Sequence, residues 1–341
     1  MQHAAMPHRY PILDELRGIA ALCVLLLHAF RPLMPHAYLA VDFFFLLSGF
    51  VIGLAYEERL ADGRLSPAGF ILARLRRLYP MLLAGLAFGL ALMACSPARP
   101  TLSPLLLLNL LVIPIFGDVD AFPPDAPVWS LFMELAACVG YGLALPWLTT
   151  RRLAGLIAVS GLALIGIAWA MGDLSLGWQG SAREFFGAFP RVGWSFGLGL
   201  LTFRLIREGA LRPPPVAAGV APLLLVLALA APLPAMAGSL LCVGIVFPLV
   251  LLAGIGAGEQ RWSGPAAWLG RISYPLYILH GPATKFVGQL ALPWPDFVLW
   301  QTLVVLASLA CAAFAERYYE RPLRAWLARR PDRSGAVRAG A

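Results

Sequence analysis

Apolar stretches recur along the whole chain and are separated by short polar connections. A helix that crosses the hydrocarbon layer of a membrane needs about 20 apolar residues, with a range of roughly 17–25. The pattern therefore predicts an all-α, polytopic transmembrane bundle with ten crossings. The predicted segments are residues 14–34, 38–56, 78–95, 128–148, 152–171, 186–206, 215–234, 238–257, 271–291 and 297–319.

A further apolar run, residues 104–116, is too short for an ordinary crossing and has Pro104 and Pro114 near its ends. Arginine and lysine concentrate on the cytoplasmic side of membrane proteins, so the arginine clusters help to place this run. The clusters lie in residues 57–77, 151–152, 204–212, 261–271 and 317–330. All of them share one side only if residues 104–116 do not cross, and we expect this run to be re-entrant or to lie at the surface.

The same path places both termini in the cytoplasm. It predicts a short cytoplasmic segment (residues 1–12), one membrane domain (residues 13–324) and a basic cytoplasmic tail (residues 325–341). The N-terminus does not read as a cleavable signal peptide, because Asp14 and Glu15 precede the apolar run.

Composition supports a membrane protein and removes other classes. Of the 341 residues, 60% are hydrophobic and 13% are charged, whereas soluble domains have roughly 25% charged residues. The net charge of +8 comes mostly from the arginines that membrane topology demands, so it does not indicate a nucleic-acid partner. The five cysteines are scattered singly, which predicts neither a disulfide framework nor a metal site.

The first segment carries an arginine near its start, Arg17, and a single histidine, His28. Eleven residues correspond to about three turns and about 16 Å of helix, so both side chains share one face. If Arg17 marks the membrane edge, His28 lies near the middle of the ~30 Å hydrocarbon layer. A titratable group at that depth is a candidate functional site. The alternative is a histidine that is hydrogen-bonded to a neighbouring helix or faces a wet cavity.

Two carboxylates also fall inside apolar segments. In the second segment, Asp42 shares a face with Gly49, which would let another helix approach closely, and Ser48 precedes that glycine. In the segment that begins near residue 128, Glu134 shares a face with Ser130. An arginine elsewhere, for example Arg183 or Arg191, is an alternative structural partner for Glu134.

The stretch FILARLRRLYP, residues 70–80, places Arg74 and Arg77 three residues apart, with Tyr79 beside them. Side chains at this spacing are neighbours on a helix surface. Two interpretations stay open from the residues alone. One is topological anchoring with Tyr79 at the interface, and the other is a patch that binds phosphate, since paired guanidinium groups suit phosphate oxygens.

The stretch LGRISYPLYILHGP, residues 269–282, places Ser273, Tyr277 and His280 on one face of a helix that Pro275 can kink. His280 would lie about 13 Å beyond Arg271 along the axis. It is therefore the rival of His28 as a base. The pair Glu320–Arg321 closes the last segment at the predicted cytoplasmic edge.

Taken in order, these stretches resemble the integral-membrane acyltransferase-3 family over residues 13–324. The shared motifs are the arginine and histidine of the first helix, VDFFFLLSGFVI (41–52), FxxxRxxRLYP (70–80), VWSLxxE (128–134), LGxISYPLYxLH (269–280) and ERPLR (320–324). One departure is Glu15, where the family commonly has glycine. The chain looks like a stand-alone member without an appended esterase-like domain.

The resemblance implies transfer of an acyl group, often acetyl, from cytoplasmic acyl-coenzyme A to a hydroxyl. It implies a bacterial-type plasma (inner) membrane location, and acceptors that are glycans or lipid-linked sugars. Acyl-coenzyme A would be a donor substrate and not a permanently bound cofactor. The competing interpretation is a transporter or flippase, in which four polar residues form a substrate or proton path: His28, Asp42, Glu134 and His280.

The residues and the resemblance together predict the site. His28 would be the base, with Arg17 nearby, and Ser48 or His28 would carry the acyl group if an acyl-enzyme forms. Asp42 and Glu134 would orient the histidine or shape the acceptor side. The donor would contact Arg74, Arg77, Tyr79, Ser273, Tyr277 and His280.

Overall fold

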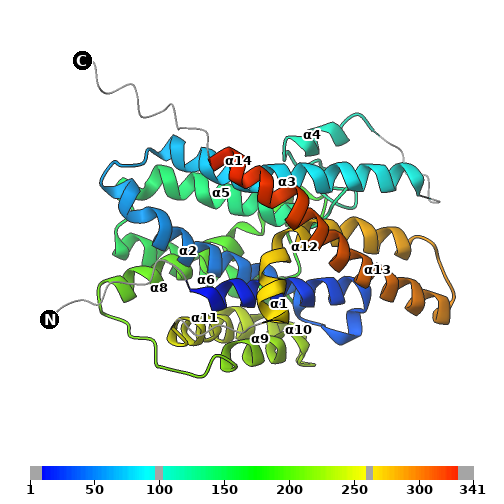
Figure 1. Ribbon diagram of the computed structural model, residues 1–341. Coiled ribbons are helices and arrows are strands. Elements are labelled where there is room, and N and C mark those ends of the chain that lie inside the picture. Colours follow the sequence, from blue (N-terminus) through cyan, green and yellow to red (C-terminus); the bar gives the residue numbers. More distant parts are fainter. Residues whose placement is uncertain (1–9, 97–102, 259–263, 329–341) are drawn as a thin grey trace, which may run out of the picture.

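The computed structural model describes residues 10–96, 103–258 and 264–328, and Figure 1 shows them as helices that run side by side along one direction. The predicted all-α membrane bundle is confirmed, and the described residues contain no β-strand. The α-helices are α1 (Pro11–Ala29), α2 (Ala40–Ala61), α3 (Pro67–Cys95), α4 (Leu106–Leu110), α5 (Val128–Ala144), α6 (Thr150–Met171), α7 (Ala182–Phe186), α8 (Phe189–Arg207), α9 (Val220–Ala230), α10 (Ala235–Leu241), α11 (Phe247–Gly256), α12 (Pro265–Gly288), α13 (Trp294–Ala315) and α14 (Arg321–Ala328).

Short helical turns of other types complete the chain path. Three are 3-10 helices: η1 (Arg31–Leu33), η2 (Ala37–Leu39) and η3 (Leu145–Trp147). Two are π-helical: η4 (Cys242–Val246) joins α10 to α11, and η5 (Glu316–Glu320) joins α13 to α14. The predicted terminal segments, residues 1–12 and 325–341, and Arg261 of one arginine cluster fall largely or wholly outside the described residues.

Each of the ten predicted segments contains a helix, but several boundaries differ. The first helix ends at Ala29 and not near residue 34, because Phe30 leaves helical geometry and Pro32 lacks the N–H that would continue the α-helical hydrogen bonds. The third helix begins at Pro67 and not near residue 78. There Ser66 accepts a hydrogen bond from the Gly69 N–H, so a capped start precedes the apolar part.

Within the described residues, six helices are both long and apolar enough to cross a membrane. They span Ala37–Ala61, Pro67–Cys95, Val128–Trp147, Thr150–Met171, Ala235–Gly256 and Trp294–Leu327. The helices α1, α8 and α12 have spanning length but carry charged or polar residues, and α9 has eleven residues. The number of ten crossings stays a prediction.

The run 104–116 does not form a long helix. Near the start of α3, Arg74 contacts Glu134 of α5, and near its far end Gly89 packs against Pro124, just before α5. The two helices are therefore antiparallel, and the segment between them leaves and returns at one end of the bundle. Among the described residues of this segment the only α-helix is α4, in which Leu107 is exposed, as is Leu111 directly after it.

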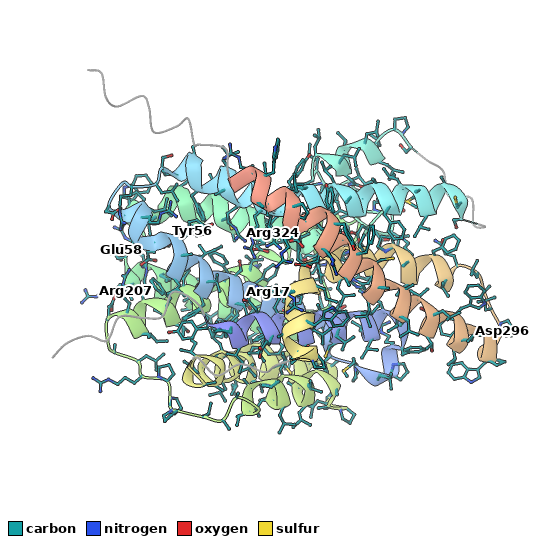
Figure 2. The ribbon with its side chains drawn as sticks, viewed as in Figure 1. Arg17, Tyr56, Glu58, Arg207, Asp296 and Arg324 are labelled. Carbon is teal, nitrogen blue, oxygen red and sulfur yellow. The ribbon has the colours of Figure 1, made fainter. Side chains whose placement is uncertain are left out.

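The two ends of the bundle carry different connections. Figure 2 shows Glu58 and Arg207 toward one end and Asp296 at the opposite end, with the labels of Arg17 and Arg324 between them. The beginning of α1 and the end of α14 both lie in the half of the molecule that holds Glu58 and Arg207 (Figure 1).

Two pairs of parallel helices form the centre. In α1 and α12, a Cβ atom added at Gly18 would lie 2.4 Å from the backbone nitrogen of Gly270. In α2 and α8, a Cβ at Gly49 would lie 2.1 Å from the carbonyl oxygen of Phe196. The close approach predicted at Gly49 is thus confirmed, since only glycine leaves room for the neighbouring backbone.

A buried ion pair joins α2 to α8. Arg191 Nη2 lies 2.5 Å from Asp42 Oδ2, and both side chains are buried. The same guanidinium donates to the Leu176 carbonyl and lies over the Trp129 ring at 5.2 Å from its centroid. A buried charge is costly unless it is paired and hydrogen-bonded, and this cluster meets both needs.

Candidate functional site

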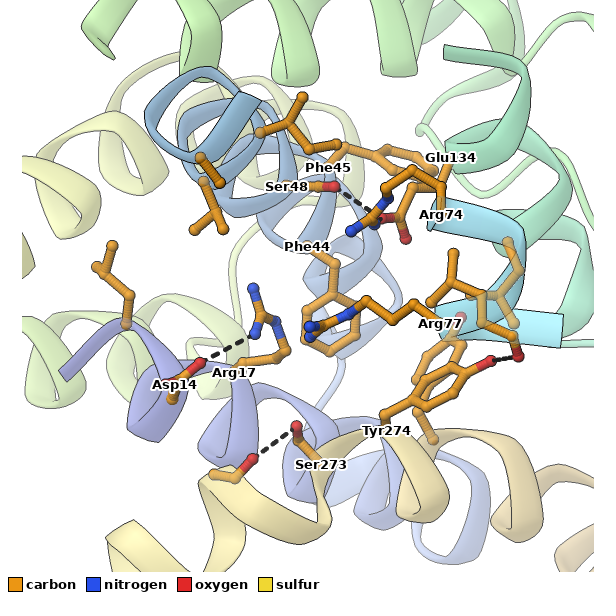
Figure 3. A pocket seen from close by; sticks show the side chains of 18 of the residues that line it. Asp14, Arg17, Phe44, Phe45, Ser48, Arg74, Arg77, Glu134, Ser273 and Tyr274 are labelled. Atoms are coloured by element: carbon orange, nitrogen blue, oxygen red, sulfur yellow. Dashed lines mark hydrogen bonds and ion pairs between the residues drawn. The ribbon is translucent and has the colours of Figure 1, made fainter. Parts of the chain in front are cut away.

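A cavity of about 510 Å³ opens among α1, α2, α3, α5, α12 and the α13–α14 segment. Its volume falls in the usual range of small-molecule pockets, roughly 300–1,000 Å³. Charged and polar side chains line it together with aromatic rings, as Figure 3 shows from close by. Among the predicted site residues, those that line it are Arg17, Ser48, Arg74, Arg77, Glu134, Ser273 and Tyr277.

Two arginines from different helices point into the cavity. Figure 3 shows the guanidinium groups of Arg17, on α1, and Arg77, on α3, directed toward one another. Arg17 Nη1 lies 3.2 Å from Asp14 Oδ1. Within the described part of the chain, Arg77 donates no hydrogen bond and forms no ion pair, while the charges of Arg74, Arg17 and Arg324 all act on it. The cavity therefore concentrates positive charge, which the carboxylates in its lining neutralise only in part.

Arg74 also lines the cavity, but its guanidinium is paired with a carboxylate. Its Nη2 lies 2.5 Å from Glu134 Oε1, which also accepts a hydrogen bond from Ser48 Oγ at 2.7 Å. The partner of Glu134 is thus Arg74 and neither Arg183 nor Arg191. Arg74 is also buried, so it does not act as a surface anchor for the topology.

The inner wall of the cavity is formed by polar groups and rings on α2, α5 and α12. Ser130 Oγ donates to the Pro127 carbonyl and lies 2.8 Å from the Tyr277 hydroxyl. The Tyr277 ring makes an edge contact with Phe44, at 5.4 Å between centroids. Ser273 Oγ donates to the Gly270 carbonyl. The Tyr277 side chain therefore forms the inner wall of the cavity.

The two histidines that the sequence presents as rivals lie against each other. His28 Nδ1 is 2.8 Å from His280 Nε2, and the rings are stacked with centroids 5.0 Å apart. The parallel packing of α1 and α12 brings them together. Neither histidine lines the cavity. Tyr277 does line it, and the centroid of its ring lies 5.8 Å from the centroid of the His280 ring.

The position of His28 within its helix differs from expectation. His28 was expected in the interior of a longer helix, but it occupies the last turn of α1, which ends one residue later. His28 is exposed, whereas His280 is completely buried. Only one ring of the pair is thus accessible from outside the bundle.

Two predicted site residues lie elsewhere. Asp42 does not line the cavity and pairs with Arg191, and within the described residues it forms no hydrogen bond with His28 that could orient the ring. Tyr79 also lies outside the cavity, and its hydroxyl donates to the Leu110 carbonyl at 2.6 Å. Both side chains join segments that are distant in the sequence.

Other lining residues were not predicted. Tyr274 follows Ser273 directly, lines the cavity and donates to the Leu78 carbonyl. Glu320 and Arg324 form an ion pair at 3.1 Å beside it. The ERPLR motif could have identified Glu320 and Arg324, because these two residues are four apart and so lie on one helix face.

Outside the cavity, Asp125 is an unusual acid in the connection before α5. It is buried, and within the described residues neither of its carboxylate oxygens has a hydrogen-bond partner. A Cβ atom added at Gly281 would lie 2.8 Å from Asp125 Oδ1. Burial raises the pKa of Asp125 well above its usual range, and the nearby charge of Lys285 lowers it only in part.

Comparison with known proteins decides the family. A family model described as an acyltransferase domain matches residues 10–317, which hold every predicted site residue. The chain belongs to the acyltransferase-3 family. It is a membrane acyltransferase that transfers groups other than aminoacyl groups, and this membership favours the enzyme over the transporter considered from the sequence.

A curated relative is similar to about half of the chain. The acyltransferase is 34% identical over 180 residues to "Protein 2 in picA locus" of Rhizobium radiobacter, a match that covers 47% of this chain and 94% of the relative. No solved structure matches it. Among the described residues, no three histidine, cysteine, aspartate or glutamate side chains gather as a metal site would need.

Proposed function

We propose that this acyltransferase moves an acyl group, acetyl by resemblance, from cytoplasmic acyl-coenzyme A to a hydroxyl of a cell-surface glycan or lipid-linked sugar. We place it in the plasma membrane of a bacterium, with both termini in the cytoplasm. One observation carries the proposal: a positively charged cavity opens among helices whose arginine-rich ends are predicted to be cytoplasmic, and a histidine pair lies directly behind its inner wall.

The donor is assigned to the arginine side of the cavity. Coenzyme A carries phosphates, and guanidinium groups bind phosphate oxygens through two parallel hydrogen bonds. Arg77 is the strongest candidate, because it has no ion pair to break among the described residues. Arg17 faces it from α1 and would act on the same anion.

The thioester is assigned to the inner wall. Ser130 Oγ already donates to the Pro127 carbonyl, so the Tyr277 hydroxyl beside it is the group that can turn its hydrogen to a substrate carbonyl oxygen. The Tyr277 ring lies between Phe44 and His280, so displacement of the Tyr277 and Phe44 rings would open a passage from the cavity to the histidines. We propose that the acyl end of the donor takes this passage.

The reaction needs one proton acceptor. His28 takes the proton of the acceptor hydroxyl, whose oxygen attacks the thioester carbonyl carbon. The carbon–sulfur bond breaks, and the leaving thiolate takes the proton from the imidazolium. The products are the ester and free coenzyme A thiol, and His28 returns to its neutral form. A neutral imidazole can accept this proton and then return it.

Purified protein in liposomes tests the donor half of this proposal. We expect it to bind acetyl-coenzyme A and to release free thiol slowly without an acceptor. Mass spectrometry of the protein after donor treatment would detect an acyl group on Ser48 or His28 if a covalent intermediate forms.

The acceptor half needs cells. We expect surface glycans from cells with the protein to carry ester-linked acyl groups that are absent from cells without it and from cells with His28→Ala. Glycans that are identical in all three strains, together with no binding of any acyl-coenzyme A, would overturn the proposal.

A further inference from the structure

We propose that His280 is a positioning residue, which fixes His28 in the tautomer whose Nε2 atom is unprotonated and open to a substrate. The inference deepens the proposed function, because it rests on His28 acting as the base. It assigns different tasks to two histidines that the sequence presents as equivalents.

The first step concerns the buried ring. His280 Nδ1 lies 3.1 Å from the carbonyl oxygen of Leu276, one turn earlier in α12. A carbonyl oxygen only accepts hydrogen bonds, so Nδ1 of His280 carries the hydrogen. A neutral imidazole has one N–H, and Nε2 of His280 therefore presents a lone pair.

The second step extends the tautomer assignment from His280 to His28. His280 Nε2 lies 2.8 Å from His28 Nδ1. Because the first atom accepts, the second must donate, and Nδ1 of His28 carries the hydrogen of that ring. Nε2 of His28 is then the unprotonated nitrogen, which is the atom a general base needs.

The third step excludes His280 as the base. Both ring nitrogens of His280 are occupied, and the residue has no exposed surface. Within the described residues, His28 Nε2 has no hydrogen-bond partner, and the residue is exposed. A substrate hydroxyl can reach only His28.

The arrangement also favours the state after proton transfer. When Nε2 of His28 takes a proton, its Nδ1–H becomes the donor of a charge-assisted hydrogen bond to His280, which is stronger than the neutral one. The buried ring thus stabilises the imidazolium without taking a proton itself.

Nitrogen-15 spectra of histidine-labelled protein in lipid nanodiscs test the tautomers directly. We expect His28 to show a protonated Nδ1 and an unprotonated Nε2, and His280 to show a protonated Nδ1. Spectra of His28→Asn and His280→Gln assign the signals. A protonated Nε2 on resting His28 would overturn the inference, whether or not the protein transfers acyl groups.

Kinetics of two substitutions test the consequence for catalysis. Gln at position 280 can offer its amide oxygen near the place of Nε2, whereas Leu has a similar size and no acceptor. We expect His280→Leu to lower kcat about ten- to a hundredfold with KM for the acyl donor unchanged, and His280→Gln to recover part of that loss.

Thr284→Val, which disturbs the same helix turn without touching the ring, should keep kcat. Equal losses in the Leu and Gln variants, or a similar loss in Thr284→Val, would make His280 merely structural. If His280→Leu does not fold, the spectra of the unaltered protein still decide.

Discussion

His28 and His280 are 252 residues apart in the sequence, and their Nδ1 and Nε2 atoms lie 2.8 Å apart. The contact depends on the parallel packing of α1 and α12, where Gly18 and Gly270 let the two backbones meet. Arg17, one residue before Gly18, faces the cavity from the same helix. One helix contact therefore sets both the position of a cavity arginine and the pairing of the histidines.

Replacement of His28 should abolish catalysis while sparing the donor site. We expect His28→Ala to lower kcat by about a hundred- to ten-thousandfold, which is the usual contribution of a general base. Acetyl-coenzyme A affinity should hardly change, because His28 does not line the cavity. Stopped transfer with intact binding, measured on purified protein, is the expected result. Normal turnover in this variant would remove His28 from the mechanism.

Arg77→Ala should weaken donor binding. The charge-assisted hydrogen bonds lost with one guanidinium are worth ~1.5–3 kcal/mol, about ten- to a hundredfold in affinity. Arg77→Lys should recover only part, since an ammonium cannot reproduce the planar fork. Arg76→Ala is the matched control, because this neighbour does not line the large cavity. Titration with acetyl-coenzyme A measures all three, and equal affinities in the Arg76 and Arg77 variants would contradict the assignment of the phosphates.

Much of the fold could be predicted because apolar runs report helices directly. The boundaries were less accurate where a helix continues into polar sequence. The first three turns of α3 contain Arg74 and Arg77, so hydropathy placed the helix start later than Pro67. The Ser66–Pro67 pair held the missing signal, since serine caps helices and proline favours their first turn.

Seven of the predicted site residues line the cavity, but the way in which these residues pair could not be predicted. The sequence marks Glu134 and Asp42 as carboxylates inside apolar segments, and it offers an arginine as an alternative partner for Glu134. Several arginines could have served each of them, and only the helix packing assigns Arg74 to the first and Arg191 to the second. The same limit explains Tyr79, which shares a motif with Arg77 but contacts the Leu110 carbonyl on another face of α3.

Asp125→Asn should stabilise the protein near neutral pH. The folded-state pKa of Asp125 is raised, so its carboxyl stays protonated in the folded protein at pH values where the unfolded chain, with a pKa of about 3.9, is ionised. This group therefore makes the free energy of unfolding fall as pH rises from about 4 through the raised pKa. Asparagine has nearly the same shape and does not ionise, so the fall should become shallower. Thermal unfolding of purified protein at several pH values measures it.

The neighbouring acid provides a control of opposite sign. Asp120 Oδ2 lies 2.5 Å from Lys285 Nζ, so Asp120→Asn removes an ion pair and should lower the unfolding temperature. Asp118→Asn, at an exposed residue, should change little. A lower unfolding temperature in Asp125→Asn than in the unaltered protein at pH 7 would show that the buried carboxyl is needed in its charged form.

Gly18→Ala should impair activity through helix packing. An added methyl group would lie 2.4 Å from backbone atoms of Leu269 and Gly270, which cannot move aside as a flexible side chain can. The helices α1 and α12 must then separate, and this shifts Arg17 and His28 relative to α12. We expect a loss of both activity and thermal stability. Gly166→Ala in α6 is the control, because nothing lies within 4 Å of its added methyl group. Equal behaviour of the two variants would mean that the bundle tolerates the shift.

The proposed orientation can be tested with reporter fusions. Donor entry from the cytoplasm requires that the end of the bundle with Glu58 and Arg207 faces that compartment. Fusions after Gly63, Arg152 and Arg212 should therefore report cytoplasm. Because α3 and α5 are antiparallel, the segment between them returns to the end it left, so fusions near Asp120 and Trp178 should both report the outside. A bridge between Asp120 and Gln179 places these two connections at the same end. Opposite signals at Asp120 and Trp178 would contradict this packing, whereas a complete inversion of all five signals would keep the fold and place the arginine-lined cavity on the wrong side for a cytoplasmic donor.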